Sequence, residues 1–391
     1  MKVGIVSCYF HYNYGSMLQA YATQWAVDSL GGDAITIACN SPITYMTQPK
    51  INYYIHKVTN GDIVRTKIRQ YRSKKNMKNY PNIKKCISER NKKFYDFSLS
   101  NFNLSELNVN RKSLSEFTST CDAVVVGSDM LWHPVNVEHD YFTLTFVPDG
   151  VKKISYATSI GTAKIPMYQI ETYKRFLSRF KYISVREQSG VEVISNLNIG
   201  KQASLVLDPT LLFTGEEWMR IQEKEPIIEG KYILCYFLGV NQEHRKFAQE
   251  LKKVTGCKIV ALQHLDEFVK NDIGFGDIIS YDIGPAELVN LIRNAKFVCT
   301  DSFHGTCFSI LNHKKFFIMN RFSNSNTQST NTRIDSLLSL TGLEKQKIGD
   351  NWKEHDLFEL LNNEIQYKLV DKKIEEERQK SLAYLKNALY G

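Results

Sequence analysis

The sequence predicts an α/β protein built from two doubly wound, Rossmann-like domains that face a cleft. Three observations predict this class. Buried-type strands alternate with helices up to residue 207, and the same alternation starts again at residue 232. No internal repeat or low-complexity tract is evident in the chain. A chain of 391 residues also exceeds one ordinary core, so two domains are expected.

The first forty residues have the pattern of one βαβ unit. Residues 2–7 predict a buried strand, 16–30 a helix with one apolar face, and 34–38 the next strand. Ser16 with Gln19 three residues later matches a capping box, which predicts the helix start there. Later strands are expected at 122–126, 154–157, 182–185 and 204–207, with helices at 168–179 and 188–196.

The second half shows the same alternation of strands and helices. Strands are expected at 232–238, 258–262, 297–300 and 315–319, and helices at 242–255, 285–294, 305–311 and 371–390. We therefore expect an N-terminal Rossmann-like domain over residues 1–207. A C-terminal Rossmann-like domain would cover 208–350, and helices in 351–391 would pack back on both.

The positive charge is concentrated in one segment. Between Lys57 and Lys93, thirteen Lys and Arg against two acids give a local charge of +11, above the +9 of the whole chain. This segment lies in a helical insertion expected at about residues 50–100. It predicts either peripheral contact with an anionic membrane leaflet or a solvated helical face. Nucleic-acid binding is disfavoured, since no recognised nucleic-acid module surrounds the segment.

Compartment signals favour the cytoplasm. The N-terminus has no signal-peptide pattern, and the longest apolar stretch, Tyr232–Val240, is about half of what a bilayer requires. The eight cysteines are scattered without a C-x-x-C pair, which is typical of buried thiols in a reducing compartment, so neither a disulfide nor a metal site is expected. We expect a cytoplasmic protein, with the inner membrane face as a place of peripheral contact.

The strongest chemical signal is the segment 297–311, an apolar strand followed by a short polar loop and a helix. Unsatisfied amides at the helix start, beside Gly305 and Thr306, predict an anion site that includes Ser302. His304 stands at the mouth of this site, where an imidazole gives and takes protons near neutral pH. The alternative is that His304 only caps the helix or fills a polar gap.

Two loops on the N-terminal side are candidates for sugar binding. The first is Asn13-Tyr14-Gly15-Ser16, after the first strand, where helix capping and ligand contact both remain open. The second contains Ser128, Asp129 and Trp132. Its carboxylate can take a hydroxyl proton and its indole can lie on a sugar face, although an aspartate there can also be only a turn residue.

Two arginines are candidates for anion binding. Arg186 follows a predicted strand and can hold a carboxylate or phosphate in a bidentate fork. Pairing of Arg186 with Glu187 is discounted, because neighbours in an extended segment point opposite ways. Arg333 is a weaker candidate for the same role.

Taken in order, these segments resemble the polysaccharide pyruvyl transferase family. The matching pieces are Asn13–Tyr21, Val126–Trp132, Ser155–Gly161, Ser184–Glu187, Leu207–Leu212, Asp301–Thr306 and Arg333–Ile334. The resemblance runs from residue 3 to about residue 340. It implies a fold similar to GT-B glycosyltransferases, with the acceptor on the side of domain 1–207 and the anionic donor on the side of domain 208–350. It also implies transfer of enolpyruvate from phosphoenolpyruvate onto a sugar, with formation of a cyclic ketal and release of phosphate.

The resemblance also implies roles for individual residues. His304 matches the proposed catalytic histidine, and Arg186 an arginine expected to bind phosphoenolpyruvate. Some members carry an arginine two residues before the histidine, where this chain has Ser302, so Arg333 or the helix amides would supply the missing charge.

The implied acceptor is a saccharide precursor of a capsule or exopolysaccharide, lipid-linked or not. Phosphoenolpyruvate would serve as co-substrate, and no other cofactor is implied. The alternative enzyme is a GT-B-type glycosyltransferase that uses a nucleotide sugar.

Overall fold

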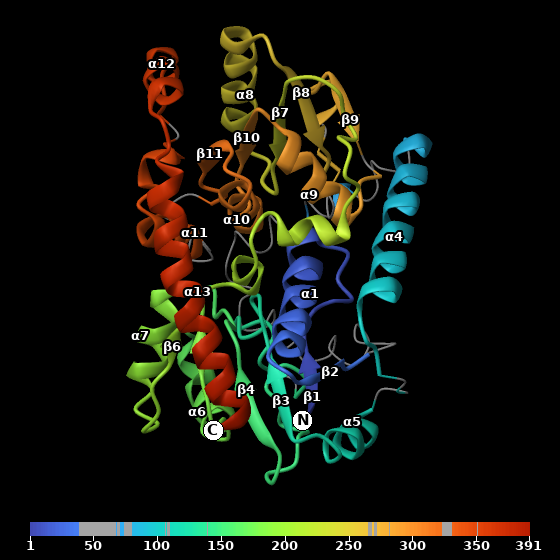
Figure 1. The fold of residues 1–391 in the computed structure, drawn as a ribbon, viewed down its shortest axis with the longest axis vertical. Coiled ribbons are helices and arrows are strands. Elements are labelled where there is room, and N and C mark those ends of the chain that lie inside the picture. Colours follow the sequence, from blue (N-terminus) through green and yellow to red (C-terminus); the bar gives the residue numbers. More distant parts are fainter. Residues whose placement is uncertain are drawn as a thin grey trace.

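The protein is an α/β molecule of two stacked halves, each with its own parallel sheet (Figure 1). The computed structural model describes residues 1–38, 68, 71–73, 80–105, 107, 110–138, 140–264, 268–269, 272–280, 282–322, 331–349 and 351–391.

The first sheet has the strand order β2-β1-β3-β4, with all neighbours parallel. Its strands are β1 (Lys2–Val6), β2 (Asp33–Thr36), β3 (Ala123–Val126) and β4 (Lys152–Ser155). Strand β3 is a continuous apolar run that is buried along its whole length, as expected for a parallel sheet covered on both faces. The chain leaves β1 toward β2 and later returns to β3 on the other side. The topological switch point therefore lies between β1 and β3.

The first half has further helices and one small parallel sheet of two strands. The helices are α1 (Tyr14–Ser29), α4 (Pro81–Asn101), α5 (Arg111–Thr118), α6 (Ile170–Leu177) and α7 (Gln188–Asn196), and the small sheet pairs β5 (Ser184–Val185) with β6 (Ser204–Leu205). Short 3-10 turns occur at η1 (Met167–Gln169), and at η2 (Pro209–Leu212) and η3 (Glu217–Ile221) on the way to the second half. Another, η5 (Glu344–Gln346), lies in the second half.

Helix α1 begins earlier than the capping-box pattern predicts. The N-cap is Asn13, whose side-chain oxygen accepts a hydrogen bond from the amide of Ser16 at 3.2 Å. Ser16 lies inside the first turn, so its hydroxyl is free of the capping role and points elsewhere. Almost every residue of α1 up to Val27 is buried, because the helix lies between elements of both halves.

The second sheet has six parallel strands in the order β12-β11-β10-β7-β8-β9. They are β7 (Tyr232–Tyr236), β8 (Lys258–Leu262), β9 (Ile278–Ser280), β10 (Phe297–Thr300), β11 (Lys315–Met319) and β12 (Lys347–Ile348). The helices are α8 (Gln242–Thr255), α9 (Pro285–Asn294), α10 (Phe303–Leu311), α11 (Thr332–Thr341), α12 (Glu354–Asn362) and α13 (Tyr367–Tyr390). Here the switch point lies between β7 and β10.

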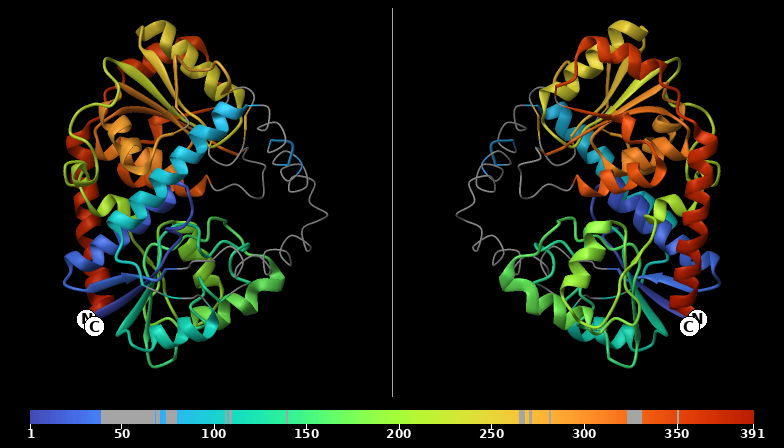
Figure 2. Two further views of the ribbon diagram at one scale, coloured as in Figure 1. Left: turned by 90° about the vertical axis from the view of Figure 1, so that its right-hand side faces the viewer. Right: turned by 90° about the vertical axis from the view of Figure 1, so that its left-hand side faces the viewer.

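Helix α13 runs from the second half back to the first, and the two ends of the chain lie side by side (Figure 2). The Ser381 hydroxyl accepts a hydrogen bond from the Leu207 amide at 2.9 Å, and Lys152 Nζ donates to the Leu389 carbonyl at 2.8 Å. The C-terminal helix thus packs on the link between the halves and on the β4 side of the first sheet.

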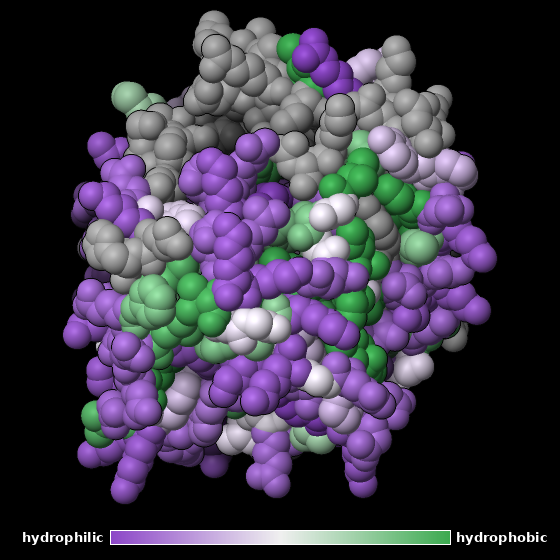
Figure 3. All heavy atoms as spheres, turned by 90° about the horizontal axis from the view of Figure 1, so that it is seen from above, coloured by the Kyte–Doolittle hydropathy of each residue, from purple (hydrophilic) through white to green (hydrophobic). Residues whose placement is uncertain are grey.

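The molecular surface is largely hydrophilic on the face above the second half, with hydrophobic side chains in patches between (Figure 3). In the part of the chain that the structure describes, no helix combines the length and the apolar character that crossing a bilayer would require. Most of the basic segment 57–93 lies outside the described residues, apart from positions 68, 71–73 and 80–93.

Candidate active site

The switch points of the two sheets meet at one place. Asp129 follows β3 in the first half, and the loop before His304 follows β10 in the second. A Cβ atom on Gly15 would overlap the imidazole ring of His304, so the start of α1 lies directly against that ring. Because ligands bind beyond the carboxyl ends of strands at a switch point, this junction is the candidate site.

Arg186 is the centre of the site. Its Nη1 lies 2.5 Å from Asp208 Oδ2 and its Nη2 lies 3.0 Å from Asp129 Oδ1, with the side chain fully buried. The guanidinium carbon is 4.7 Å from the centre of the Phe303 ring, a cation–π contact. Arg186 therefore joins a carboxylate from the β3 loop to one from the segment that leaves the first half.

Glu187 points away from Arg186, as expected for neighbours in an extended segment. Its Oε1 accepts hydrogen bonds from the Ser159 hydroxyl at 2.9 Å and from the amides of Ile160 and Gly161 at 2.8 and 3.1 Å. Glu187 therefore holds the loop at residues 159–161, while Arg186 interacts with the carboxylates of the site.

Arg333, from α11 of the second half, approaches the same carboxylate. Its Nη1 is 4.0 Å from Asp129 Oδ1, and its guanidinium carbon is 5.7 Å from the centre of the Phe303 ring. The Ser16 hydroxyl donates to Asp129 Oδ2 at 2.7 Å. Two guanidinium groups from different halves thus converge on Asp129.

Asp129 also has an unusual backbone. Its φ angle of 72° lies in the left-handed region, which aspartate tolerates better than most residues. Burial opposes its charged form, but Arg186, His304 and Arg333 outweigh burial and hold the pKa of Asp129 well below its usual range. The carboxylate is therefore ionised, and in this arrangement it is a weak proton acceptor.

His304 lies among polar groups rather than in a hydrophobic interior. Its Nε2 is 3.7 Å from Asp208 Oδ2 and has no hydrogen-bond partner among the described residues. The residue is 7% exposed, and the edge of its ring meets Phe303 at 5.2 Å between centroids. The imidazole is thus placed to contact a neighbouring carboxylate, although it lines neither of the two cavities described below.

Asp208 is a site residue that the sequence did not predict. Its Oδ1 accepts from the amide and hydroxyl of Thr210 at 3.0 and 2.7 Å, while Oδ2 faces Arg186 and His304. Burial would raise the pKa of Asp208, but the contact with His304 and the charge of Arg186 lower it far below its usual range. A turn is enough to explain the Asp-Pro-Thr sequence, so the sequence alone gives no sign that Asp208 contacts the site.

The start of α10 does not offer the predicted anion site at Gly305 and Thr306. Ser302 is the N-cap, and its hydroxyl accepts from the Gly305 amide at 3.2 Å. The Thr306 amide donates to the Ser302 carbonyl at 3.0 Å, as does the Thr306 hydroxyl at 3.0 Å. Both amides are therefore used within the helix start, and the expectation that they hold an anion is wrong.

Part of the predicted sugar site lines a cavity of about 450 Å³ in the first half. Asn13, Ser16 and Asp129 contribute to it, together with the polar side chains of His11, Arg90, Asn91 and Asn136. Tyr14 does not line this cavity, since its hydroxyl donates to the Ile283 carbonyl of the second half at 2.8 Å. We refer to this cavity as the amide cavity.

Trp132 and Ser128 are buried, and the expectation that they contact a sugar is wrong. The indole is wholly buried, donates to the Phe142 carbonyl at 3.1 Å and lies 5.3 Å from the ring of Phe180. Its large apolar area is stabilised in the core of the first half. The Ser128 hydroxyl is also buried and donates to the Ala157 carbonyl at 2.7 Å.

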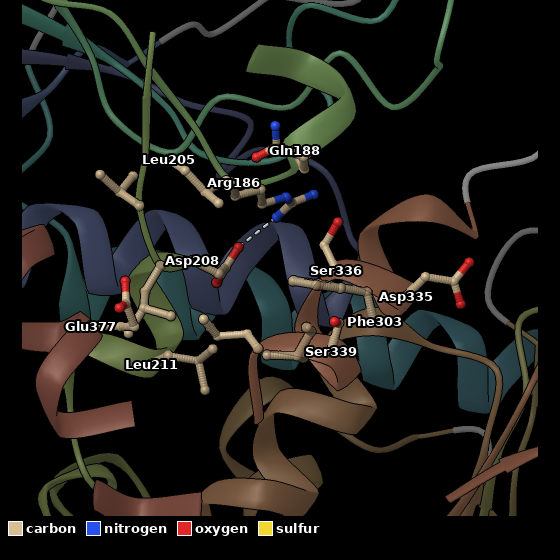
Figure 4. A pocket seen from close by; sticks show the side chains of 14 residues that line it. Arg186, Gln188, Leu205, Asp208, Leu211, Phe303, Asp335, Ser336, Ser339 and Glu377 are labelled. Atoms are coloured by element: carbon tan, nitrogen blue, oxygen red, sulfur yellow. Dashed lines mark hydrogen bonds and ion pairs between the residues drawn. The ribbon is translucent and has the colours of Figure 1, made fainter. Parts of the chain in front are cut away.

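A second cavity, of about 470 Å³, lies on the other side of Arg186 (Figure 4). Arg186, Asp208 and Phe303 line it together with side chains from the link between the halves and from α11, including Leu211 and Ser336. The dashed line in Figure 4 marks the ion pair of Arg186 with Asp208. The charged cluster therefore stands between two cavities, with Asp129 facing one and Asp208 the other. Among the described residues, no group of His, Cys, Asp and Glu side chains has the arrangement of a metal site.

Known proteins resemble this chain in fold, and one protein family matches its sequence. No curated protein matches the sequence. Among solved structures, the fold is similar to that of UDP-GlcNAc 2-epimerase from Methanocaldococcus jannaschii, with a TM-score of 0.51 and 12% identity over 94% of this chain and 93% of that chain. MurG from Acinetobacter baumannii matches with a TM-score of 0.43 and 9% identity over 99% of this chain and 97% of that chain.

These likenesses concern the fold alone. The likeness to the epimerase, together with the two parallel sheets, confirms the predicted class of two Rossmann-like halves in a GT-B-like arrangement. The sequence itself matches the model of the polysaccharide pyruvyl transferase family over residues 13–324. That match covers most of the chain and spans Asp129, Arg186, Asp208 and His304. The chain belongs to the polysaccharide pyruvyl transferase family.

Proposed function

We propose that the protein transfers the enolpyruvyl group of phosphoenolpyruvate to a sugar and releases phosphate. The observation that carries this proposal is the convergence of Arg186 and Arg333, one from each half, beside His304. Phosphoenolpyruvate has a carboxylate and a phosphate, and guanidinium groups bind both in a bidentate fork. Arg333 would supply the charge that Ser302 lacks.

The electrostatics of the arginine pair favour an added anion. Burial and the nearby charge of Arg186 lower the pKa of Arg333 to about 10. The Asp129 carboxylate offsets part of the repulsion between the two guanidinium groups, and an anionic donor beside them would offset more of it. We therefore place the donor beside Arg333, where it shares both guanidinium groups with Asp129.

His304 is the proposed acid. Its Nε2 lies 3.7 Å from the Asp208 carboxylate, and the imidazole would give a proton to the methylene carbon of the donor. The neighbouring carbon then becomes electrophilic, and the first sugar hydroxyl adds to it. A second hydroxyl of the same sugar then displaces phosphate from that carbon and gives its proton back to the imidazole of His304. Two C–O bonds form, one C–O bond to phosphate breaks, and the ketal closes.

Asp129 is the proposed acceptor of the hydroxyl proton, with Ser16 beside it at 2.7 Å. Its low pKa in the free protein depends on Arg186 and Arg333. A donor that shares these arginines and adds negative charge would raise the pKa of Asp129, which makes the carboxylate a better base only when the donor is bound. The proposal therefore implies that the donor binds before proton transfer from the sugar.

The test is release of inorganic phosphate from phosphoenolpyruvate by purified protein with saccharide acceptors. The variant His304→Ala should lower kcat about a hundredfold or more, because it removes the acid. Ser302→Ala is the control, since Ser302 caps the same helix start and should change kcat by no more than a few-fold. Turnover that survives in His304→Ala would remove the assignment.

A nucleotide-sugar glycosyltransferase is the alternative, because the similar epimerase fold is named for a UDP-sugar. At the switch point of the second sheet, however, the amides of Leu238 and Gly239 already donate to Asp301 at 2.6 and 2.8 Å. Amides that are already bonded do not serve as a diphosphate cradle. Thermal stabilisation by UDP, with no effect of phosphoenolpyruvate, would favour the alternative.

The acceptor belongs, in this proposal, to the assembly of a capsule or exopolysaccharide at the cytoplasmic side of the membrane. The basic segment 57–93 would hold the protein near an anionic leaflet. Flotation with liposomes tests this part alone, since equal recovery with neutral and anionic lipid contradicts it.

A further inference from the structure

Helix α4 places one of its cations in a cavity wall. Lys84, Lys85 and Lys92 are exposed on this helix, and Lys93 pairs with Glu287 of α9 at 2.6 Å. Arg90 differs from all of these, because it is 3% exposed and lines the amide cavity. In the sequence Arg90 belongs to the basic segment 57–93, but in the structure it is buried apart from the exposed lysines of the same helix.

The position of Arg90 is fixed by aromatic packing one turn further along α4. Phe94 is buried and its ring centre lies 5.1 Å from that of Tyr14 and 5.8 Å from that of Tyr12. Residues three to four apart share a helix face, so Ile87, Arg90 and Phe94 all face the first half. The guanidinium is therefore held at the cavity by the fold.

The remaining polar wall of the amide cavity suits a saccharide. Asn13, Asn91 and Asn136 offer amide groups, and Asn91 Oδ1 has no hydrogen-bond partner among the described residues. Side-chain amides donate and accept, which matches sugar hydroxyls. Asp129 is the acidic residue of this wall, and it is bound by Ser16 and Arg186.

We propose that the amide cavity binds a saccharide that carries an oxyanion, either a carboxylate or a phosphate, and that Arg90 recognises this group. A guanidinium presents donors in one plane and fits both oxyanions in a fork. The sugar hydroxyls would then lie against the asparagine amides and toward Ser16 and Asp129. The identification of this saccharide as the acceptor rests on the proposed function, but the binding site does not.

The experiment measures binding by calorimetry with the full chain and without phosphoenolpyruvate. The probes are glucuronate, glucose 1-phosphate and glucose. At least one anionic probe should bind about tenfold or more tightly than glucose, and Arg90→Gln should remove that difference. Binding of glucuronate alone identifies a carboxylate as the recognised group, and binding of glucose 1-phosphate alone identifies a phosphate.

The matched control is Lys92→Gln, which removes an exposed cation from the same helix and should leave all three affinities unchanged. Arg90→Lys should keep part of the preference, because a charge remains without the planar fork. Asn91→Ala, on the same wall, should weaken every probe by a few-fold while thermal unfolding stays unchanged, which covers the case in which Arg90→Gln fails to fold.

Equal binding of glucose and both anions, failure of both anions to bind, or a preference that persists in Arg90→Gln overturns the proposal. The proposed function fails separately, through absence of phosphate release from phosphoenolpyruvate. A protein that binds the anionic probes through Arg90 but releases no phosphate would contradict only the proposed function.

Discussion

The two sheets carry an aspartate at the same topological place and use it in different ways. Asp129 follows β3 beside β1, and Asp301 follows β10 beside β7. The Asp301 side chain is fully buried and accepts from two backbone amides. The Asp129 side chain remains 15% exposed and is bound by the side chains of Ser16 and Arg186.

This difference supports the proposed role of Asp129 and assigns none to Asp301. Backbone amides hold Asp301 in a fixed loop and cannot exchange it for a ligand without rebuilding that loop. Side chains hold Asp129, and they can turn toward a substrate at the cost of a rotamer change. The kind of partner, rather than the position in the topology, separates Asp301 from Asp129, which we propose as the functional one.

The largest expected effect is on the free energy of unfolding of Asp301→Ala. Removal of this carboxylate leaves the half-buried amide of Leu238 and the buried amide of Gly239 without an acceptor, and should cost about 3–5 kcal/mol. Asp129→Ala should cost less than about 2 kcal/mol of stability, because Arg186 would still form its ion pair with Asp208. The same substitution should lower phosphate release about a hundredfold. Urea denaturation and the phosphate assay measure the two quantities, and equal losses of stability would contradict the comparison.

The next effect separates the two arginines that bind Asp129. Arg186→Met leaves Asp129 and Asp208 without their main buried cation and should destabilise the protein by about 3 kcal/mol. Arg333→Met should raise KM for phosphoenolpyruvate about tenfold or more while stability changes by less than about 1 kcal/mol. If Arg333→Met leaves KM unchanged, the donor does not bind where we place it.

Acid should reduce the contributions of both Asp129 and Asp301 to the stability of the fold. Burial opposes the charged forms of Asp129 and Asp301, but Arg186 and His304 in one case and His244 and Arg321 in the other lower their pKa values. A lowered pKa stabilises the fold above the unfolded value near 4, and this stabilisation is lost as the pH falls through the folded value. Below pH 4, unfolding of Asp129→Asn should therefore depend less on pH than that of the wild type, by up to about 1.4 kcal/mol per pH unit. A slope equal to that of the wild type would contradict this reasoning.

The smallest effect concerns the two helix caps. Asn13→Ala and Ser302→Ala each remove an N-cap acceptor and should each cost about 1 kcal/mol, visible as a lower Tm. Asn13 also lines the amide cavity, whereas Ser302 does not. Only Asn13→Ala should therefore weaken saccharide binding as well, and a parallel loss in Ser302→Ala would contradict the assignment of the cavity.

Much of the fold could be predicted from the sequence. The helices 242–255 and 285–294 and the strands 258–262, 297–300 and 315–319 have the predicted bounds, because apolar runs and helix signals agree there. Strand β9 and helix α11 were not predicted. Three half-buried residues at a sheet edge give no clear alternation, and α11 follows a polar stretch without an N-cap side-chain bond.

The site was predictable only in part. Asp129, Arg186 and His304 follow predicted strands, so the topology brings them together. Asp208 was missed because its role depends on contacts with residues far away in the sequence, and its local sequence already explains it as a turn. Trp132 was misplaced because the sequence of a loop does not show whether an indole turns inward to the core.

Helix α13 is synthesised late, although it packs against the first half. Its Ser381 and Tyr384 hydrogen-bond to Leu207 and Ser155, and its Leu385 is fully buried. These residues are synthesised after every strand of both sheets. During translation, the apolar surface beneath α13 therefore stays uncovered until this helix is synthesised, and transiently exposed apolar surface is prone to aggregation.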